Sequence, residues 1–478
     1  MRNDKSWISC EIQEIVLSTE NILKRLAVKS TSFFYFYAVK QLIMDIESLH
    51  NIFLACSTVT TDSRNCPDNS MFFALKGESF NGNIYALDAI KSGARYAVVD
   101  DKDIDTSSEN IILVDDVLKT LQQLALYHRE WLSIPIVAIT GTNGKTTTKE
   151  LIREVLNQKY NIEATRGNFN NHIGVPLTLL SFTKDTEIGI VEMGANHPGE
   201  IEFLCNITRP DFGLITNIGK AHLEGFGSIE GVMKTKGELY THLAKSAGTI
   251  FVNRDNSILK EILPEGTETV LYGTENNDGV VHGQTSNSGF FLKLKWTNTV
   301  TENSYDIDTK LIGNYNLENV LAAITIGCYF NVPDENINSA ISNYTPSNNR
   351  SQYLKTDRNE ILLDAYNANP SSMQKALENF KETDGNKKVL ILGGMKELGS
   401  DSEQEHIALI SIIKTVGADK VYLIGEEFKP HLELIHEARY FCNVNELITN
   451  LERNPLSGYK ILVKGSRSNK LEKCVGYL

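Results

Sequence analysis

The sequence lacks the features that mark exported, membrane-spanning and nucleic-acid-binding proteins. Its seven cysteines are odd in number, widely spaced and without a CxxC pair, which argues against a disulfide framework and a thiolate zinc site. No apolar run approaches the roughly 18 residues of a membrane span, and we recognise no signal peptide. Lysine and arginine number 47 against 60 acidic residues, so no broad basic face is available for a nucleic acid. We therefore expect a cytoplasmic protein with neither a membrane span nor a nucleic-acid partner.

The composition is that of an ordinary globular protein, with 41% hydrophobic and 22% charged residues. A length of 478 residues predicts about three domains of roughly 150 residues each. Short apolar runs alternate with helix-like stretches, and a Thr/Asn/Gly-rich β segment interrupts them at about 270–308. The alternation after Tyr344 is typical of a doubly wound α/β domain. We predict an α/β protein with domains over residues 44–132, 133–343 and 344–478.

A glycine-rich loop between an apolar strand and a helix is the strongest local signal. Its sequence, Gly-Thr-Asn-Gly-Lys-Thr, follows the strand expected at 136–140 and precedes the helix expected at 146–158. Glycines let backbone N–H groups turn toward an anion, and a helix N-terminus favours negative charge. Ile139 stands where the full phosphate-loop pattern has glycine, and a plain glycine-rich turn is the alternative. We predict that Lys145 binds terminal phosphates and Thr146 a Mg²⁺ ion, in a nucleotide-binding loop of Gly141, Thr142, Asn143, Gly144, Lys145, Thr146 and Thr147.

Two further polar side chains follow strands of the same domain. Glu192 comes directly after the apolar run 188–191, and His222 lies shortly after the strand expected at 213–216. The carboxyl ends of parallel strands meet at one edge of a sheet, so we expect both residues to face the phosphates held by Lys145. A carboxylate and an imidazole in that place predict a divalent-metal site. Each residue alone is more typical of a capping or solvated position.

The residues alone leave two questions open. The segment 167–176 is dense in Asn and Gly, which favour turns, but its amides also suit a polar ligand. The phosphate loop is compatible with a switch or transport ATPase as well as with an enzyme that makes bonds. Against the switch, the sequence has neither an Asn-Lys-x-Asp motif nor an apolar strand ending in a Walker-B Asp.

Taken in order, these features and several others resemble the Mur ligase family. The resemblance covers the chain from Met44 to its C-terminus. Residues 1–43 match nothing in the family, and we interpret them as an N-terminal extension upstream of a working start at Met44. The motifs are Thr61–Arg64, Phe73–Gly77, Gly141–Thr148, Asn168–Pro176, Glu192–Gly194, Asn217–Gly227, Lys236–Glu238, Asn316 with Asn319, Asp364–Pro370 and Lys464–Arg467.

The resemblance implies a UDP-substrate-binding N-terminal domain, a central P-loop ATPase domain and a C-terminal Rossmann-like domain. It also implies that ATP, with one or two Mg²⁺ ions, drives amide formation through an acyl phosphate. The N-terminal motifs and Asp364–Pro370 are most similar to family members that add D-alanyl-D-alanine to a UDP-N-acetylmuramoyl-tripeptide. A folylpolyglutamate-type or other amino-acid ligase is the alternative, and the N-terminal motifs argue against it. We expect a monomer.

The resemblance also implies roles for individual residues. It makes Lys145, His222, Lys236 and Arg350 catalytic, and Lys236 a carbamylated metal ligand beside Thr146, Glu192 and His222. For ATP it adds Asn316 and Asn319 near adenine, Asp364 near the ribose and Arg350 at the γ-phosphate. The substrate-binding residues that it implies are Ser63, Arg64, Lys76, Asn168, Asn170, Asn171, Asn367, Lys464, Ser466 and Arg467.

Three positions depart from the family pattern. Tyr315 stands where the family often has histidine, and Gly394 stands where it has an acidic residue. Asn81-Gly82-Asn83 replaces an Asp-Gly-His type of turn near the uridine site. None of the three lies in the phosphate loop or among the predicted metal ligands.

Overall fold

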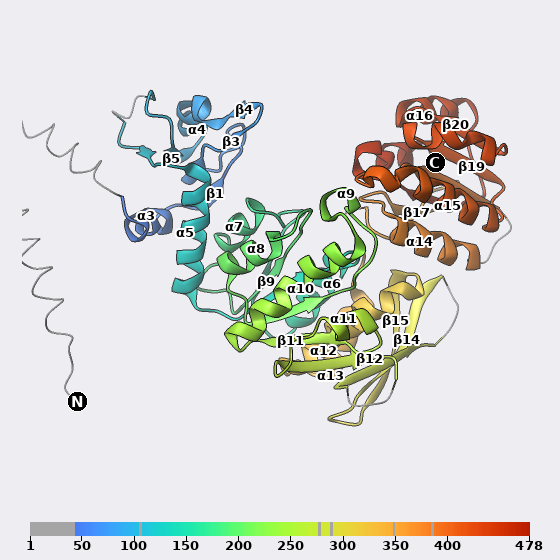
Figure 1. The fold of residues 1–478 in the computed structure, drawn as a ribbon, viewed down its shortest axis with the longest axis horizontal. Helices are drawn as coiled ribbons and strands as arrows, with labels where there is room; N and C mark the ends of the chain where they lie inside the picture. The colour runs from blue at the N-terminus through green and yellow to red at the C-terminus, as the bar shows by residue number, and fades with distance from the viewer. Residues whose placement is uncertain (1–43, 105–107, 276–278, 287–289, 348, 384–386) are drawn as a thin grey trace, which may run out of the picture. The chain divides into compact units, whose positions relative to one another are not determined.

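The computed structural model describes residues 44–104, 108–275, 279–286, 290–347, 349–383 and 387–478. They belong to two compact units, one ending at Tyr127 and one running from His128 to Leu478 (Figure 1). The extension expected over residues 1–43 lies outside the described residues. Within the described ranges, no helix combines the length and the apolar character needed to cross a membrane.

The first unit is built on a small parallel sheet. Its strands lie in the order β1-β2-β5-β6, and β2 is buried along its whole length. Asp45 begins the first helix, because its carboxylate accepts the N–H of Ser48 at 2.7 Å. The elements are α3 (Ile46–Leu54), β1 (Val59–Thr60), β2 (Ser70–Phe73), β3 (Lys76–Gly77), β4 (Phe80–Asn81), η1 (Gly82–Tyr85), α4 (Ala86–Lys91), β5 (Ala94–Val99), β6 (Ile111–Leu113) and α5 (Val117–Leu132).

Lys76 lies outside the buried strand that precedes it, because β2 ends at Phe73. Lys76 instead begins β3, an exposed two-residue strand that pairs antiparallel with β4. The cause is a tight turn, because Gly82 N donates to Leu75 O at 2.8 Å and a Cβ at Gly82 would lie 2.6 Å from that oxygen.

The second unit contains a nine-stranded sheet in the order β15-β14-β13-β12-β11-β10-β7-β9-β8. Neighbours from β13 to β8 pair parallel, whereas β13, β14 and β15 pair antiparallel. Strands β12–β15 form the β segment predicted after residue 270. The strands are β7 (Ile136–Thr140), β8 (Ile162–Ala164), β9 (Ile188–Glu192), β10 (Phe212–Ile215), β11 (Thr249–Asn253), β12 (Glu268–Gly273), β13 (Val281–Thr285), β14 (Phe291–Asn298) and β15 (Ser304–Ile312).

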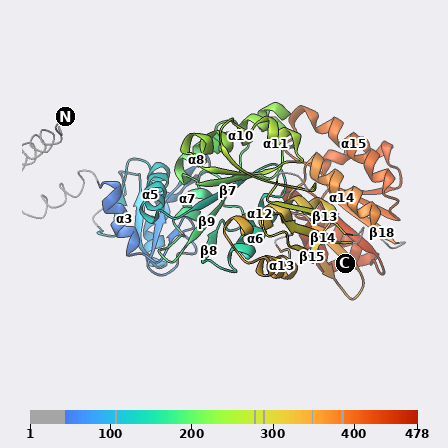
Figure 2. The same ribbon diagram turned by 90° about the horizontal axis from the view of Figure 1, so that it is seen from below.

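Helices cover both faces of this sheet (Figure 2). On one face, α6, α12 and α13 share an apolar cluster with the strands. On the other lie α8 and α10, where Gly213 of β10 leaves room for Leu239 and Leu243. Strands β7 and β9 are buried at every residue, as expected for strands covered on both faces. The helices are α6 (Lys145–Leu156), α7 (Gly174–Leu179), α8 (Glu200–Thr208), α9 (Leu223–Phe226), α10 (Ile229–Ser246), α11 (Ser257–Glu261), η2 (Asn314–Asn316), α12 (Leu317–Tyr329) and α13 (Asp334–Asn343).

Strand β7 lies at a switch point of this sheet. From β7 the chain passes through α6 to β8 on one side, whereas β10 pairs with β7 on the other side. Ligands of open α/β sheets bind outside the carboxyl ends of the strands at such a point. Three adjacent strands end there, at Thr140, Glu192 and Ile215.

A second, six-stranded sheet occupies the C-terminal part of the same unit, in the order β16-β17-β21-β18-β19-β20. All neighbours pair parallel except β16 with β17. One apolar cluster joins it to α14 and α15, and another joins its opposite face to α16 (Figure 1). The α/β prediction is therefore confirmed. The elements are β16 (Gln352–Lys355), β17 (Glu360–Asp364), α14 (Pro370–Glu382), β18 (Lys388–Gly393), η3 (Gly399–Asp401), α15 (Ser402–Thr415), β19 (Lys420–Ile424), η4 (Glu426–Leu434), β20 (Ala438–Phe441), α16 (Val444–Arg453), β21 (Lys460–Lys464), η5 (Arg467–Asn469) and η6 (Leu471–Tyr477).

Candidate functional site

The loop between β7 and α6 is a turn that requires glycine at two positions. Gly141 has φ 142° and Gly144 has φ 81°, in the region that L side chains rarely adopt. A Cβ on Gly144 would lie 2.6 Å from Asn319 Oδ1, and one on Gly141 would collide with the hydroxyl of Thr216. The backbone can therefore approach its neighbours closely, which a phosphate loop needs in order to aim its N–H groups.

Asn217, from the loop after β10, holds the rest of this turn. It accepts the N–H of Thr142 on its backbone oxygen at 2.9 Å and the N–H of Asn143 on its side-chain oxygen at 3.0 Å. Lys145 folds back, and its Nζ donates to the carbonyl oxygens of Gly141 and Thr142 at 2.6 and 3.0 Å. These two contacts hold the ammonium group beside the loop.

Glu192 lies beside the first turn of α6, as predicted. Its side chain is buried, with 1% exposure. One carboxylate oxygen accepts from the Thr146 hydroxyl at 2.9 Å, and the other accepts from the Asn170 amide at 2.9 Å. Its backbone N–H donates to the Thr165 hydroxyl at 2.9 Å. Both oxygens are therefore fixed next to a hydroxyl of the phosphate loop.

The phosphate loop, Glu192 and His222 line one cavity of about 560 Å³. Gly141 and two other predicted site residues, Lys236 and Ser466, are buried but do not line it. The predicted residues that line the cavity are Thr142, Asn143, Gly144, Lys145, Thr146, Thr147, Asn168, Asn170, Asn171, Glu192, His222, Asn316, Asn319, Arg350, Asp364, Asn367, Lys464 and Arg467.

The C-terminal sheet contributes an ion pair to this cavity. Asp364 and Lys464 end the neighbouring strands β17 and β21 in register, and Lys464 Nζ lies 2.5 Å from Asp364 Oδ2. Asn369, which caps α14, donates from its amide to Asn143 Oδ1 in the phosphate loop at 2.9 Å. Side chains from both sheets of the second unit therefore meet at one place.

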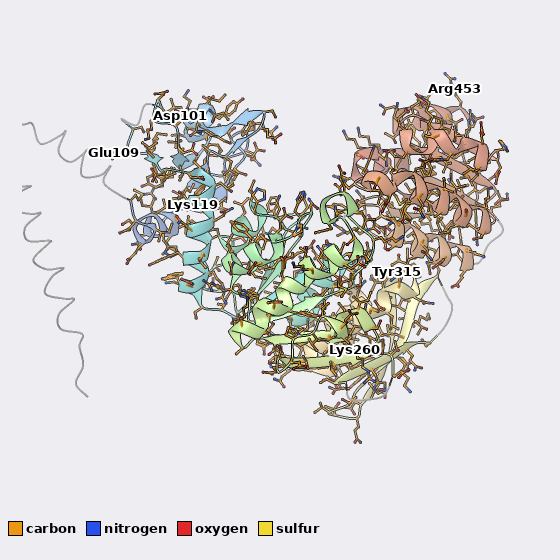
Figure 3. All side chains as sticks on the ribbon, viewed as in Figure 1. Asp101, Glu109, Lys119, Lys260, Tyr315 and Arg453 are labelled. Atoms are coloured by element: carbon orange, nitrogen blue, oxygen red, sulfur yellow. The ribbon has the colours of Figure 1, made fainter. Side chains whose placement is uncertain are left out.

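Two amides at the start of α12 support the phosphate loop from behind. Asn319 Oδ1 accepts from the Thr148 hydroxyl at 3.0 Å, and its amide donates to Asn316 Oδ1 at 2.9 Å. Tyr315, labelled in Figure 3, directly precedes them, and its hydroxyl lies 3.0 Å from Ser351 Oγ. The tyrosine at the departure from the family pattern therefore bonds to the segment that leads into β16.

Lys145 is close enough to Arg350 and to Lys236 for their positive charges to repel one another at or beside this cavity. Burial, together with repulsion from Arg350, lowers the pKa of Lys145 to about 8. Burial and then repulsion from Lys145 lower the pKa of Lys236 to about 7, and its Nζ lies over the Phe226 ring at 5.3 Å. Anions bound in the cavity would relieve this repulsion, so the electrostatics favour a polyanionic ligand.

For the Asn- and Gly-rich segment 167–176, the sequence left open whether its amides form a turn or contact a ligand. The structure shows both. Asn168, Asn170 and Asn171 all line the cavity, and Asn170 binds Glu192 as described. Asn171, however, uses its side-chain oxygen to accept the N–H groups of Ile173 and Gly174 at 3.1 and 2.9 Å, at the start of α7. One amide belongs to the site, and another ends a turn.

Sequence reasoning missed several residues of this site. Glu397 lines the cavity, and its Oε2 lies 2.5 Å from His222 Nδ1. Tyr366 stacks on the guanidinium of Arg350, whose central carbon lies 3.6 Å from the ring centre. Tyr366 lies in the motif Asp364–Pro370, and Glu397 lies three residues after the departure from the family pattern at Gly394. The available signal was this short distance along the chain between a missing acid at 394 and an acid at 397.

The donors at the loop fit a Mg²⁺ ion that arrives with a nucleotide. The described residues contain no cluster of three or more His, Cys, Asp or Glu side chains that could bind a metal without other ligands. Mg²⁺ is commonly held by one or two carboxylates together with water and substrate phosphates. The buried carboxylate of Glu192, hydrogen-bonded to the hydroxyl of Thr146, meets that requirement.

Three predicted substrate residues belong to the first unit. Arg64 is bidentate to Asp62, with Nε–Oδ1 and Nη2–Oδ2 distances of 2.8 Å, and Ser63 lies between them in the chain. Lys76 Nζ lies 2.8 Å from Asp100 Oδ1, which also accepts from the Asn83 amide at 2.8 Å. The Asn81-Gly82-Asn83 turn therefore contacts the same carboxylate as Lys76.

Three segments of the chain match descriptions of known domains. Residues 56–129 match the Mur ligase family catalytic domain, 139–327 the Mur ligase middle domain and 349–467 the Mur ligase glutamate ligase domain. The UDP-N-acetylmuramoyl-tripeptide–D-alanyl-D-alanine ligase of Bacillus subtilis is 36% identical over 428 residues, which cover 87% of this chain and 92% of that protein.

Solved structures agree with these matches. MurF from Acinetobacter baumannii gives a TM-score of 0.79 at 27% identity, covering 90% of this chain and 98% of that one. The MurF ligase of Thermotoga maritima in complex with ADP gives 0.76 at 26% identity, covering 89% and 97%.

Proposed function

Because the chain belongs to the Mur ligase family, we propose that it joins D-alanyl-D-alanine to the terminal carboxylate of a UDP-N-acetylmuramoyl-tripeptide. The Bacillus subtilis relative is named for this reaction and matches over 92% of its length. The protein is thus an ATP-dependent, ADP-forming ligase of peptidoglycan synthesis and cell wall biogenesis. We retain the three-domain partition at residues 44–132, 133–343 and 344–478 as part of the proposal.

The geometry that supports this proposal most is the shared cavity. The phosphate loop and Glu192 come from the central sheet, whereas Asp364 and Lys464 come from the C-terminal sheet. A ligase must hold a nucleotide against a second, activated substrate, and groups from two sheets around one cavity suit that task. A simple switch ATPase needs only the first set.

The first chemical step brings two anions together. The tripeptide carboxylate attacks the γ-phosphorus of ATP, the bond to the β,γ-bridging oxygen breaks, and ADP leaves an acyl phosphate behind. We assign Lys145 and Arg350 to the neutralisation of the phosphoryl oxygens in the transition state. Thr146, Glu192 and His222 would hold a Mg²⁺ ion, which would supply further positive charge beside the phosphates.

In the second step, the neutral amine of D-alanyl-D-alanine attacks the acyl carbon. The C–N bond forms, the C–O bond to phosphate breaks, and the amine loses a proton. We assign Lys464, Ser466 and Arg467 to the incoming dipeptide, together with Asn367, whose backbone oxygen lies 3.4 Å from Lys464 Nζ. Closure of groups from both sheets around the bound substrates would exclude water and so protect the acyl phosphate from hydrolysis.

The remaining site predictions belong to the same proposal. Asn316 and Asn319 serve adenine, Asp364 the ribose, and Ser63, Arg64 and Lys76 the uridine diphosphate end of the substrate. Lys236, buried and with a pKa near 7, is proposed to carry a carbamate that binds a second metal ion. We propose a monomer that works in the cytoplasm, where ATP and UDP-linked precursors are available.

The test measures ADP formation with UDP-N-acetylmuramoyl-tripeptide and D-alanyl-D-alanine, omitting each in turn. We expect sustained ADP formation only with both present, together with a product that contains the pentapeptide. Sustained ATP hydrolysis with neither substrate would contradict the proposal and favour a switch or transport ATPase. Product formation with glutamate in place of the dipeptide would favour a folylpolyglutamate-type ligase.

A further inference from the structure

A carboxylate from the C-terminal sheet contacts the histidine of the proposed metal site. His222 lies in the loop after β10, and Glu397 lies in the loop between β18 and η3. The distance from His222 Nδ1 to Glu397 Oε2 is 2.5 Å. Both residues have positive φ, 51° and 63°, a conformation that L residues seldom adopt. His222 Nδ1 is buried, and among the described residues it has no hydrogen-bond partner apart from this close approach of Glu397.

The loop that carries Glu397 is anchored at every residue before it. Gly394 N donates to Ile424 O at 2.9 Å, and Met395 N donates to the buried His406 ring at Nε2, at 3.1 Å. Lys396 N donates to Ser466 Oγ at 3.2 Å. The loop therefore presents Glu397 from a fixed base.

The departure from the family pattern at Gly394 is part of that base. A Cβ at Gly394 would collide with the side chain of Glu427, which arrives from η4. Glu427 also forms an ion pair with Lys396, and only 14% of its side chain is exposed. A carboxylate from elsewhere in the chain thus occupies the space next to residue 394 and holds the neighbour of Glu397.

We propose that Glu397 is a positioning residue of the metal site, which accepts the Nδ1–H of His222 and leaves Nε2 as the free ligand atom. A histidine that binds a metal through one ring nitrogen commonly donates the other N–H to a carboxylate or carbonyl, which fixes the tautomer and the ring orientation. The inference rests on the proposed role of His222 as a ligand. It assigns to the C-terminal sheet a part in building a metal site whose other ligands come from the central sheet.

The experiment compares E397A and E397Q with the matched control E405Q. Glu405 pairs with Lys220, two residues before His222, at 2.8 Å, so its loss also removes an acid that faces the same loop. The Glu397 side chain is 58% exposed, so its replacement leaves no cavity, and we expect all three variants to fold. The first readout is Mn²⁺ affinity by electron paramagnetic resonance in the presence of a non-hydrolysable ATP analogue.

We expect E397A to weaken Mn²⁺ binding by about 10–100-fold, E397Q to weaken it less because it keeps an acceptor oxygen, and E405Q to leave it unchanged. The second readout uses the metal-free protein, in which ¹⁵N spectra of the imidazoles report the tautomer. The His222 resonance, assigned with H222A, should show Nδ1–H in the wild type and a shift toward Nε2–H in E397A.

The outcomes separate this inference from the proposed function. Unchanged Mn²⁺ affinity in H222A would remove His222 from the metal site and with it the role of Glu397. If H222A loses Mn²⁺ affinity and E397A does not, the inference is overturned while the proposed function stands. An unchanged His222 tautomer in E397A would have the same meaning. An equal loss of Mn²⁺ affinity in E405Q would also overturn the inference. It would show that the loss of any negative charge near this loop weakens metal binding.

Discussion

At the scale of single residues, Lys145 has contacts and a pKa that depend on its place in the phosphate loop. Its ammonium group donates to two carbonyl oxygens of its own loop, and burial lowers its pKa to about 8. A lowered pKa means that the charge is fully present well below pH 8 and is lost above it. Bound phosphates favour the charged form, so nucleotide binding should raise this pKa and keep the lysine ionised.

We expect Lys145→Ala to abolish ATP-dependent ligation while the fold survives. Loss of one preorganised contact to a developing charge typically costs about 10²–10³ in rate, and Lys145 also contributes to nucleotide binding. The measurements are ADP formation under saturating substrates and thermal unfolding of the variant. Wild-type-like turnover would contradict the phosphate-loop assignment. Lys234→Ala, an exposed lysine of α10, is the control for loss of a surface charge.

The amount of carbamate on Lys236 should depend on pH. A lysine with a pKa of about 7 is neutral in about half of the molecules at pH 7, and only the neutral amine adds to carbon dioxide. The carbamate should therefore increase as pH rises from 6 to 8, and at pH 6 the amine should be mostly protonated. A ¹³C carbamate resonance in the presence of labelled bicarbonate measures it. Lys236→Ala should remove that resonance, whereas Lys234→Ala should retain it; a signal that persists in Lys236→Ala belongs to another lysine.

At the scale of elements, the turn between β7 and α6 depends on the absence of a side chain at Gly144. Gly144 and Gly227 have similar φ values, 81° and 74°. A Cβ at Gly227 meets nothing within 4 Å, whereas one at Gly144 meets Asn319, which Thr148 and Asn316 hold in place. The two positions therefore have similar backbone strain, but only Gly227 has room for a side chain.

We expect Gly227→Ala to cost only the strain of a left-handed residue, about 1–2 kcal/mol of stability. Gly144→Ala should lose more stability than Gly227→Ala, because the side chains of Asn319 and its partners behind the loop must move. It should also lose most of its affinity for ADP. Chemical denaturation measures the first quantity and calorimetric titration of ADP the second. If the two substitutions weaken ADP binding equally, the crowding at Gly144 does not contribute to nucleotide binding.

Elements buried on both faces could be predicted from sequence, and edge elements could not. The apolar runs of β7, β9 and β10 indicate their own burial, so the positions of Glu192 and of the phosphate loop followed from strand ends. Strands β8, β16 and β20 are only three or four residues long and lie at or near sheet edges, so no apolar run marks them. The contact between Glu397 and His222 joins residues 175 positions apart (397 − 222) and leaves no local pattern.

At the scale of the whole molecule, the net charge of −13 opposes the ligands that the site is built to bind. ATP and a UDP-linked tripeptide are both anionic, so their attraction must be local. Lys145, Lys236 and Arg350 supply it within one region, where burial weakens screening by salt.

The last prediction concerns which segments of the chain bind which ligand. Hydrogen exchange can test it with one ligand at a time. A non-hydrolysable ATP analogue with Mg²⁺ should slow exchange in the phosphate loop at 141–148 and in the C-terminal segments around 364–370 and 464–467, because side chains of all three line one cavity. The UDP-linked tripeptide should slow exchange around 61–83 in the first unit as well as at the cavity, because its two ends differ in chemistry. A UDP fragment without the peptide should protect only 61–83. Protection of 61–83 by the ATP analogue alone, or of 141–148 by the UDP fragment alone, would contradict the assignment of uridine to the first unit and adenine to the second.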